Sequence, residues 1–221
     1  MVITSVDSKQ LNGFLSVAEG FRLQATTHLK PKVRSNLGQY FTPLNIADLM
    51  ASMSPQTTDA IKILDPGAGT GILSAALINK LLSNTILPAS ISVTAYEIDY
   101  HLHLYLESTL NLCKRECIAA GIDFSYSILD EDFIEAGTRI VASQKQINFL
   151  EPKLSFPEFD VVIANPPYKK ISSQSTTRMN LRQIGIETSN LYTAFLAVAL
   201  LLTADNGHII AITPQVYSYC K

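Results

Sequence analysis

Five short apolar segments recur along the chain, and each is typical of a buried β-strand. They are AIKILD (60–65), SVTAYEID (92–99), FSYSILD (124–130), FDVVIAN (159–165) and GHIIAIT (207–213). Apolar residues at helical spacing lie between most of them, in GILSAALINKLLS (71–83), HLHLYLESTLNLCKRECIAAG (101–121) and NLYTAFLAVALLLTADNG (190–207). Strands that alternate with helices predict an α/β fold with a doubly wound, mostly parallel sheet and helices on both faces.

The remaining segments have weaker patterns. Residues 1–37 show helical apolar spacing and are interpreted as an N-terminal helical segment, followed by a main unit over residues 38–221. Two polar stretches are predicted to be irregular: a connection between Gly137 and Glu158, and a long mobile loop over residues 169–190. The pair Asn206-Gly207 suits the C-cap of the helix that precedes the fifth strand.

The composition narrows the class of protein. A length of 221 residues suits one domain. Hydrophobic residues make up 47% of the chain, but no apolar run reaches the ~18 residues of a membrane span, so we expect a soluble protein with no membrane partner. The first residues do not resemble a secretory signal, and three cysteines fit a reduced compartment, which favours the cytoplasm. The formal charge of −2 gives no overall attraction to nucleic acid.

Two cysteines in the stretch 101–121 invite a metal-site hypothesis. Cys113 and Cys117 continue a leucine stripe on one face of the predicted helix, so we interpret them as small core residues. His101 and His103 are two residues apart, and such side chains point in different directions on a helix. We therefore expect no metal site.

A glycine-rich turn, DPGAGTG (65–71), separates the first strand from a helix. Glycines permit backbone torsions closed to other residues and let a ligand approach the chain. A dinucleotide fingerprint would read G-x-G-x-x-G and offer a helix N-terminus to a pyrophosphate, whereas this turn reads G-x-G-x-G after a carboxylate. Asp65 would repel a phosphate and attract a cation. A tight connection without a ligand is the alternative.

Carboxylates also follow the second and third strands. Glu97 in YEID is placed to bind two ribose hydroxyls, and Asp132 in DEDF can accept from an adenine amine. Phe133 or Ile98 would cover the purine face. Each acid alone also fits a solvated strand end, but together with Asp65 they indicate a ligand with a cation, a ribose and an adenine, which describes S-adenosylmethionine.

The fourth strand ends in NPPY, Asn165-Pro166-Pro167-Tyr168. Each proline fixes its own φ and removes a backbone donor, and the residue before a proline is pushed toward extended geometry. The side chain and carbonyl of Asn165 are therefore held in a narrow range of directions.

The motifs GQYFTP, DPGAGTG, YEID, DEDF and NPPY resemble, in this order, those of the gamma-class N6-adenine DNA methyltransferases of type I and type II restriction-modification systems. The resemblance extends from about residue 34 to residue 214. It implies a Rossmann-like class I S-adenosylmethionine-dependent methyltransferase, with residues 38–221 as the catalytic domain. NPPY also occurs in glutamine methyltransferases of release factors and, as near variants, in RNA guanine methyltransferases, whereas GQYFTP favours DNA adenine.

The resemblance implies a set of cofactor contacts. Thr42 would hold the methionine end of S-adenosylmethionine, and Asp65 would contact the methionine ammonium. Thr42 is also a natural N-cap for the helix that follows it. The residues implied to bind the cofactor are Tyr40, Phe41, Thr42, Asp65, Gly67, Ala68, Gly69, Glu97, Ile98, Asp132 and Phe133.

The resemblance also gives NPPY a chemistry. The Asn165 side-chain oxygen and the Pro166 carbonyl would accept the two protons of adenine N6, so that the nitrogen lone pair can face the sulfonium methyl. Pro167 would keep these acceptors rigid, and Tyr168 would stack on a base flipped out of the duplex. Tyr192 and Phe195 are candidates for a second wall around that base, although their spacing of three also suits core packing.

In this family, two more strands and a DNA-recognition region follow the strand that carries ITP, so the resemblance implies a longer protein, here truncated after the fifth strand. The cations Lys169, Lys170, Arg178 and Arg182 suit contacts with DNA phosphates or, equally, a solvated loop. We expect a site-specific adenine methyltransferase of a restriction-modification system, with DNA and restriction or specificity subunits or domains as partners. The alternatives are methylation of a glutamine amide or an RNA base, or a non-catalytic cofactor-binding module.

Overall fold

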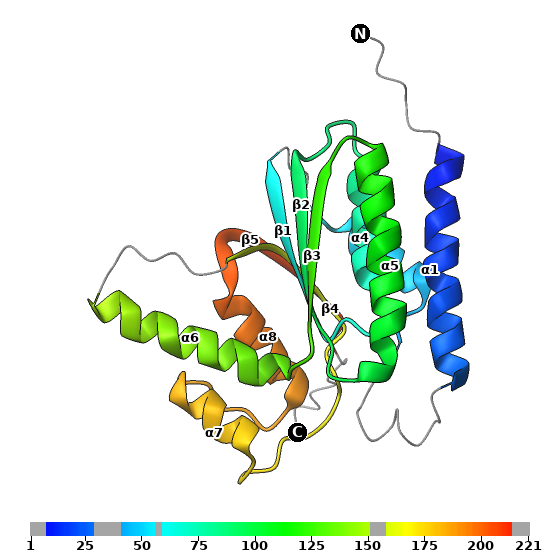
Figure 1. Cartoon of the computed structure of the whole chain (residues 1–221). Helices are drawn as coiled ribbons and strands as arrows, with labels where there is room; N and C mark the ends of the chain where they lie inside the picture. The colour runs from blue at the N-terminus through cyan, green and yellow to red at the C-terminus, as the bar shows by residue number, and fades with distance from the viewer. Residues whose placement is uncertain (1–7, 29–40, 56–58, 151–157, 214–221) are drawn as a thin grey trace, which may run out of the picture.

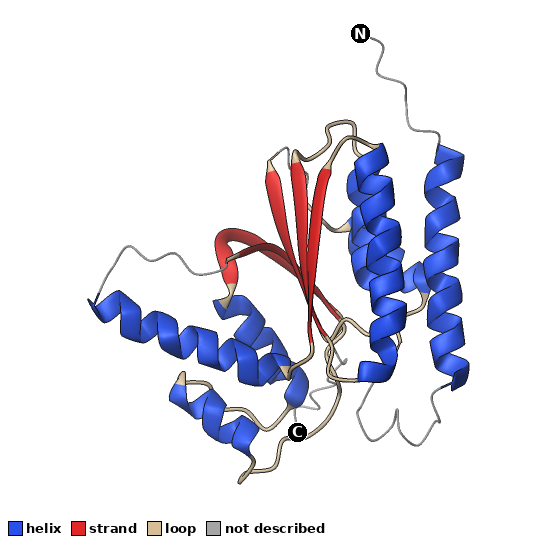
Figure 2. Cartoon of the chain, viewed as in Figure 1, coloured by secondary structure: helices blue, strands red, loops and turns tan. Residues whose placement is uncertain are grey.

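The computed structural model describes residues 8–28, 41–55, 59–150 and 158–213, and their side chains except those of residues 8–12 and 145–150. Its strands form one parallel sheet between layers of helices, in the order β3-β2-β1-β4-β5 (Figure 2). The strands are β1 (Ala60–Pro66), β2 (Ser90–Tyr96), β3 (Asp123–Leu129), β4 (Phe159–Ala164) and β5 (Thr203–Ala211). The predicted α/β fold with a parallel sheet is confirmed.

Helices cover both faces of this sheet (Figure 1). One face carries α3 (Leu44–Ser52), α4 (Ile72–Leu82) and α5 (Tyr100–Ala119), with α1 (Ser8–His28) packed against α4 and α5. The other face carries α6 (Phe133–Leu150), α7 (Thr176–Gln183) and α8 (Leu191–Leu201). Successive side chains of a strand point to opposite faces. Ile63 and Val161 therefore pack under α4, and Leu64 and Val162 pack toward α8.

The strand order reverses between β1 and β4, which are neighbours in the centre of the sheet. In open α/β sheets, ligands bind beyond the carboxyl ends of the strands at such a switch point. Asp65 near the end of β1 and Asn165 directly after β4 both lie at this point.

The prediction of an irregular connection from Gly137 to Glu158 was wrong for residues 137–150, because α6 extends from Phe133 to Leu150. Residues 151–157 lie outside the described residues. Gly137 suggested a break in the chain. A Cβ at Gly137 would lie 2.3 Å from Cγ1 of Val198 on α8, so this glycine allows two helices to approach closely. Gly137 is therefore needed for the packing of α6 against α8, and not for a turn.

The stretch 169–190 is also more ordered than predicted. It contains α7, whose N-cap is Ser175, and it closes on itself through a bridge between Lys170 and Asn190. Leu181 on α7 is fully buried in the core formed with α6 and α8. One apolar side chain thus anchors a segment whose average composition is polar.

The prediction of a helix C-cap at Asn206-Gly207 was wrong. The helix α8 ends at Leu201, and β5 already begins at Thr203. The pairing of β5 with β4 is irregular there, and a Cβ at Gly207 would lie 2.8 Å from the carbonyl oxygen of Phe159. Gly207 is therefore needed where two strands come close, and not at a helix end.

Candidate active site

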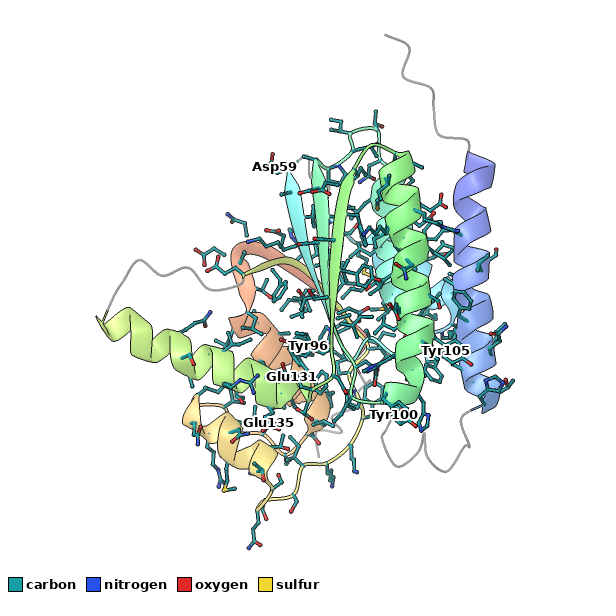
Figure 3. The ribbon with its side chains drawn as sticks, in the orientation of Figure 1. Asp59, Tyr96, Tyr100, Tyr105, Glu131 and Glu135 are labelled. Atoms are coloured by element: carbon teal, nitrogen blue, oxygen red, sulfur yellow. The ribbon has the colours of Figure 1, made fainter. Side chains whose placement is uncertain are left out.

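The carboxyl ends of the strands meet at one end of the sheet. Tyr96 at the end of β2 and Glu131 just after β3 lie there, whereas Asp59, just before β1, lies at the opposite end (Figure 3). The residues predicted from the glycine-rich turn, from YEID and from NPPY all belong to the first of these ends.

Asp65 is fully buried at the end of β1. Its Oδ2 accepts a hydrogen bond of 2.6 Å from the hydroxyl of Ser74 on α4, while its Oδ1 has no hydrogen-bond partner among the described residues. Burial raises the pKa of Asp65 to about 7; the Ser74 hydrogen bonds oppose this shift, and the nearby Glu97 adds to it. A buried acceptor without a partner is costly, so the carboxylate is suited to a bound cation.

Ser74 was not among the predicted site residues. It is a polar residue in the apolar run ILSAALI near the start of α4, and it is fully buried. A serine within an apolar run, near the start of the helix that follows Asp65, is the sequence signal that could have identified it.

The glycine-rich turn wraps around the end of β2. Gly67, Gly69 and Gly71 have φ values of +76°, +59° and +80°, a region that other residues rarely adopt. The backbone N–H groups of Gly67 and Ala68 donate to the carbonyl oxygen of Tyr96 at 2.9 and 2.8 Å. This geometry fixes the turn against β2 and explains the glycines.

Glu97 follows directly after β2, which ends at Tyr96 and is shorter than predicted. Its carboxylate accepts from two backbone N–H groups, Gly69 at 2.7 Å and Asp99 at 2.8 Å. Burial raises the pKa of Glu97, and these two hydrogen bonds oppose that shift. The acid is thus tied to the glycine-rich turn, and the exposed side chain of Ile98 follows it.

Asp132 and Phe133 have structural contacts of their own. Asp132 Oδ1 accepts from the backbone N–H of Glu135 at 3.0 Å, as a helix cap does for the start of α6. Phe133 is only 2% exposed, and its ring centroid lies 5.3 Å from that of Tyr96 and 5.2 Å from that of Phe195. Phe133 therefore packs between β2 and α8, in contact with an aromatic ring of each.

Three rings lie over the glycine-rich turn or beside NPPY. The Phe41 ring is 3.6 Å from the position of a Cβ on Gly69, and the Phe195 ring is 3.5 Å from one on Gly67. Tyr192 lies beside Tyr168, with ring centroids 6.3 Å apart. Phe195 is thus largely a core residue next to the turn, and Tyr192 is the ring that accompanies NPPY. Tyr40 lies outside the described residues.

Asn165 is held at both ends of its amide. Its Nδ2 donates to Thr42 Oγ1 at 3.0 Å, and its Oδ1 lies 3.2 Å from the hydroxyl of Tyr168. That hydroxyl also lies 3.3 Å from the carbonyl oxygen of Ile212, just past β5. Pro166 is buried, and Pro167 is half-buried. The rigid exit from β4 predicted from NPPY is thus reinforced by hydrogen bonds.

The alternative interpretation of Thr42 as an N-cap was wrong. The N-cap of α3 is Pro43, and no side chain caps this helix. Thr42 is 4% exposed, and its hydroxyl contacts Asn165 instead.

The cluster Lys169, Lys170, Arg178 and Arg182 is not a free set of cations. Arg178 and Arg182 both pair with Glu187, and these two hydrogen-bonded guanidinium groups lower the pKa of Glu187 to about 2. Glu187 neutralises part of the positive charge that was considered for phosphate contacts.

Neither a metal centre nor a membrane span occurs in the described part of the chain. No group of three or more His, Cys, Asp or Glu side chains there can hold a metal ion. Cys113 and Cys117 are fully buried in the core, as predicted. Within the described ranges, no helix is long and apolar enough to cross a bilayer.

The chain is similar to known methyltransferases over most of its length. It is 34% identical over 205 residues to the type II methyltransferase M.PstI of Providencia stuartii, which covers 93% of this chain and 38% of the relative. It is 38% identical over 208 residues to the type II methyltransferase M.BsuBI of Bacillus subtilis, covering 94% and 38%. The chain therefore spans less than half the length of these relatives.

A solved structure supports the fold. It is that of a class I S-adenosylmethionine-dependent methyltransferase from Listeria monocytogenes, with a TM-score of 0.57 and 16% identity, covering 91% of this chain and 54% of the other. A family model described as N-6 DNA methylase matches residues 26–218. With this match, the chain belongs to the N-6 DNA methylase family.

Proposed function

We propose that this chain forms the catalytic part of a site-specific DNA methyltransferase that transfers a methyl group from S-adenosylmethionine to adenine N6. The observation that carries the proposal is the position of NPPY directly after β4, at the same end of the sheet as two buried acids, Asp65 near the end of β1 and Glu97 just after β2. Membership in the N-6 DNA methylase family supports the same reaction. The similarity to two type II methyltransferases favours a restriction-modification system.

The residues fit S-adenosylmethionine. Asp65 Oδ1 is a buried acceptor without a partner among the described residues, which suits the methionine ammonium. Glu97 is held by two backbone N–H groups, so its carboxylate is preorganised for the ribose hydroxyls. Positive φ at Gly67 and Gly69 keeps these positions free of side chains, and exposed Ile98 is available to the adenine ring.

The chemistry assigned to NPPY is positioning without a covalent intermediate. The two N–H groups of adenine N6 donate hydrogen bonds to Asn165 Oδ1 and the Pro166 carbonyl, and Tyr168 stacks on the base, which has left the duplex. Bound S-adenosylmethionine supplies an electrophilic methyl group. On taking this methyl group from the sulfonium sulfur, adenine N6 would release one proton to water, and S-adenosylhomocysteine would remain.

The contact between Tyr168 and Asn165 is compatible with this role. An amide oxygen has two lone pairs, so Asn165 Oδ1 can accept from the Tyr168 hydroxyl and from the target amine at the same time. Burial raises the pKa of Tyr168, which keeps its hydroxyl protonated as a donor.

DNA is the proposed partner, with restriction or specificity subunits or domains as further partners. A protein that methylates bacterial DNA acts in the cytoplasm, which is the compartment we propose. Methylation of a glutamine amide or an RNA base would use the same NPPY geometry, but the family match favours DNA.

Transfer of a radiolabelled methyl group tests the substrate class. The product of the complete gene is incubated with labelled S-adenosylmethionine in three parallel reactions. Each reaction contains one substrate: adenine-containing DNA, RNA or release-factor protein. Label is expected in DNA, and Asn165→Ala is expected to abolish transfer while calorimetry shows retained cofactor binding. Label in RNA or protein alone would contradict the proposal. Absence of any heat with millimolar S-adenosylmethionine would contradict the cofactor assignment.

A further inference from the structure

Thr42 lies at the junction of two functional segments. The preceding residue, Phe41, packs on Gly69 of the glycine-rich turn, while the Thr42 hydroxyl accepts from Asn165 Nδ2 at 3.0 Å. Thr42 and Asn165 are 123 residues apart in the chain. Thr42 is 4% exposed, and its side chain does not cap α3. Its hydroxyl is instead hydrogen-bonded to Asn165.

The direction of the Asn165 amide decides what it presents to a substrate amine. An amide has an acceptor end and a donor end, and a donor end facing an amine cannot accept its protons. In the structure Nδ2 faces Thr42 Oγ1, and Oδ1 lies beside the hydroxyl of Tyr168. Without an acceptor at position 42, this N–H group of Nδ2 would lose its hydrogen bond to Thr42 at a part-buried position, and the loss favours rotation of the amide.

We propose that Thr42 is a positioning residue for Asn165. Its hydroxyl oxygen accepts a hydrogen bond from Nδ2 and so keeps Oδ1 directed to the target amine. This inference rests on the proposed function and deepens it. It assigns the Thr42 hydroxyl to orienting the catalytic amide, in place of the contact with the methionine end of the cofactor that the sequence resemblance implies.

Two substitutions separate this role from cofactor binding. Thr42→Val keeps the shape of the side chain and removes the hydroxyl, and Thr42→Ser keeps the hydroxyl and removes a methyl group. With saturating S-adenosylmethionine, Thr42→Val should lower kcat for DNA methylation roughly 10- to 100-fold. Thr42→Ser should stay within about 3-fold of the wild type, and the calorimetric Kd for S-adenosylmethionine should change less than about 2-fold in both variants.

Thr109→Val is the matched control. Thr109 is also fully buried, but it lies on α5, and its hydroxyl has no hydrogen-bond partner among the described residues. This variant undergoes the same chemical change and should keep the wild-type kcat. Melting temperatures of all three variants show whether each is folded.

A second readout does not depend on catalysis. In nitrogen-labelled protein, the side-chain amide protons of Asn165 should exchange with solvent faster in Thr42→Val than in the wild type or Thr42→Ser. Unchanged exchange and unchanged kcat in Thr42→Val would overturn the inference, as would a loss of cofactor affinity with kcat intact. A wild-type protein without methyltransferase activity would instead contradict the proposed function, and the exchange measurement would still decide on Thr42.

Discussion

At the scale of single residues, Asp65 is the group whose environment most strongly demands a ligand. It is fully buried, one of its oxygens has no partner among the described residues, and burial raises its pKa from 3.8 to about 7. Below pH 3.8 the folded and unfolded states both hold the proton. As the pH rises toward 7 the unfolded state releases it first, so this residue lowers the stability of the unliganded protein with rising pH.

Asp65→Asn removes this ionisation and keeps the shape of the side chain. At pH 8 the variant should exceed the wild type in free energy of unfolding by roughly 2–4 kcal/mol, and the difference should shrink toward pH 5. Urea titrations at both pH values measure it, with the same substitution at an exposed position, Asp123→Asn, as the reference for loss of one carboxylate. An equal difference at pH 5 and pH 8 would contradict the assigned pKa shift.

At the scale of elements, the strands and the apolar helices could be predicted because each has an apolar pattern of its own period. The helix α6 could not, because Gly137 and the polar residues after it are typical of a connection. The reason for a glycine within α6 lies in the neighbouring α8, where Val198 fills the space that a side chain at position 137 would need. Such a contact between two helices leaves no trace in the local sequence.

Replacement of Gly137 tests this explanation. The added methyl group of Gly137→Ala would lie 2.3 Å from Val198, so the variant should lose about 1–3 kcal/mol of stability. Gly20 lies within α1 with no atom within 4 Å of an added Cβ, so Gly20→Ala should gain roughly 0.5–1 kcal/mol. Chemical denaturation of both variants checks the opposite signs. A stabilised Gly137→Ala would mean that α6 and α8 do not pack this closely.

The candidate site could likewise be predicted only in part: its motifs can be read from the sequence, but its long-range contacts cannot. The order of the motifs and the positions of Asp65, Glu97 and Asn165 at the carboxyl ends of their strands follow from the sequence, since parallel strands place these ends at one edge of the sheet. The long-range contacts of NPPY do not follow, because Thr42, the partner of Asn165, and the carbonyl of Ile212, the partner of Tyr168, come from segments that only the fold brings near.

At the scale of the whole molecule, α1 belongs to the same core as the sheet. Phe14 and Leu15 lie in the core cluster formed with α4 and α5. The suggested boundary between residues 37 and 38 lies outside the described residues. The helix thus packs against α4, which follows the glycine-rich turn, and against α5.

Truncation of one α1 side chain measures this contribution. Phe14 is 4% exposed, so Phe14→Ala should destabilise the protein by about 3–5 kcal/mol. Leu23 on the same helix is 51% exposed, and Leu23→Ala should cost less than about 1 kcal/mol. Similar losses in both variants would show that α1 does not pack with Phe14 facing the core.

The central claim is that Asn165 directs methyl transfer to adenine N6, and the product of the reaction tests it most directly. DNA methylated by the wild-type protein, the product of the complete gene, is digested to nucleosides and analysed by mass spectrometry, beside DNA treated with Asn165→Ala. The account predicts N6-methyldeoxyadenosine from the wild type and none above background from the variant. Methylcytosine as the wild-type product, or an equal yield of N6-methyldeoxyadenosine from both proteins, would contradict it.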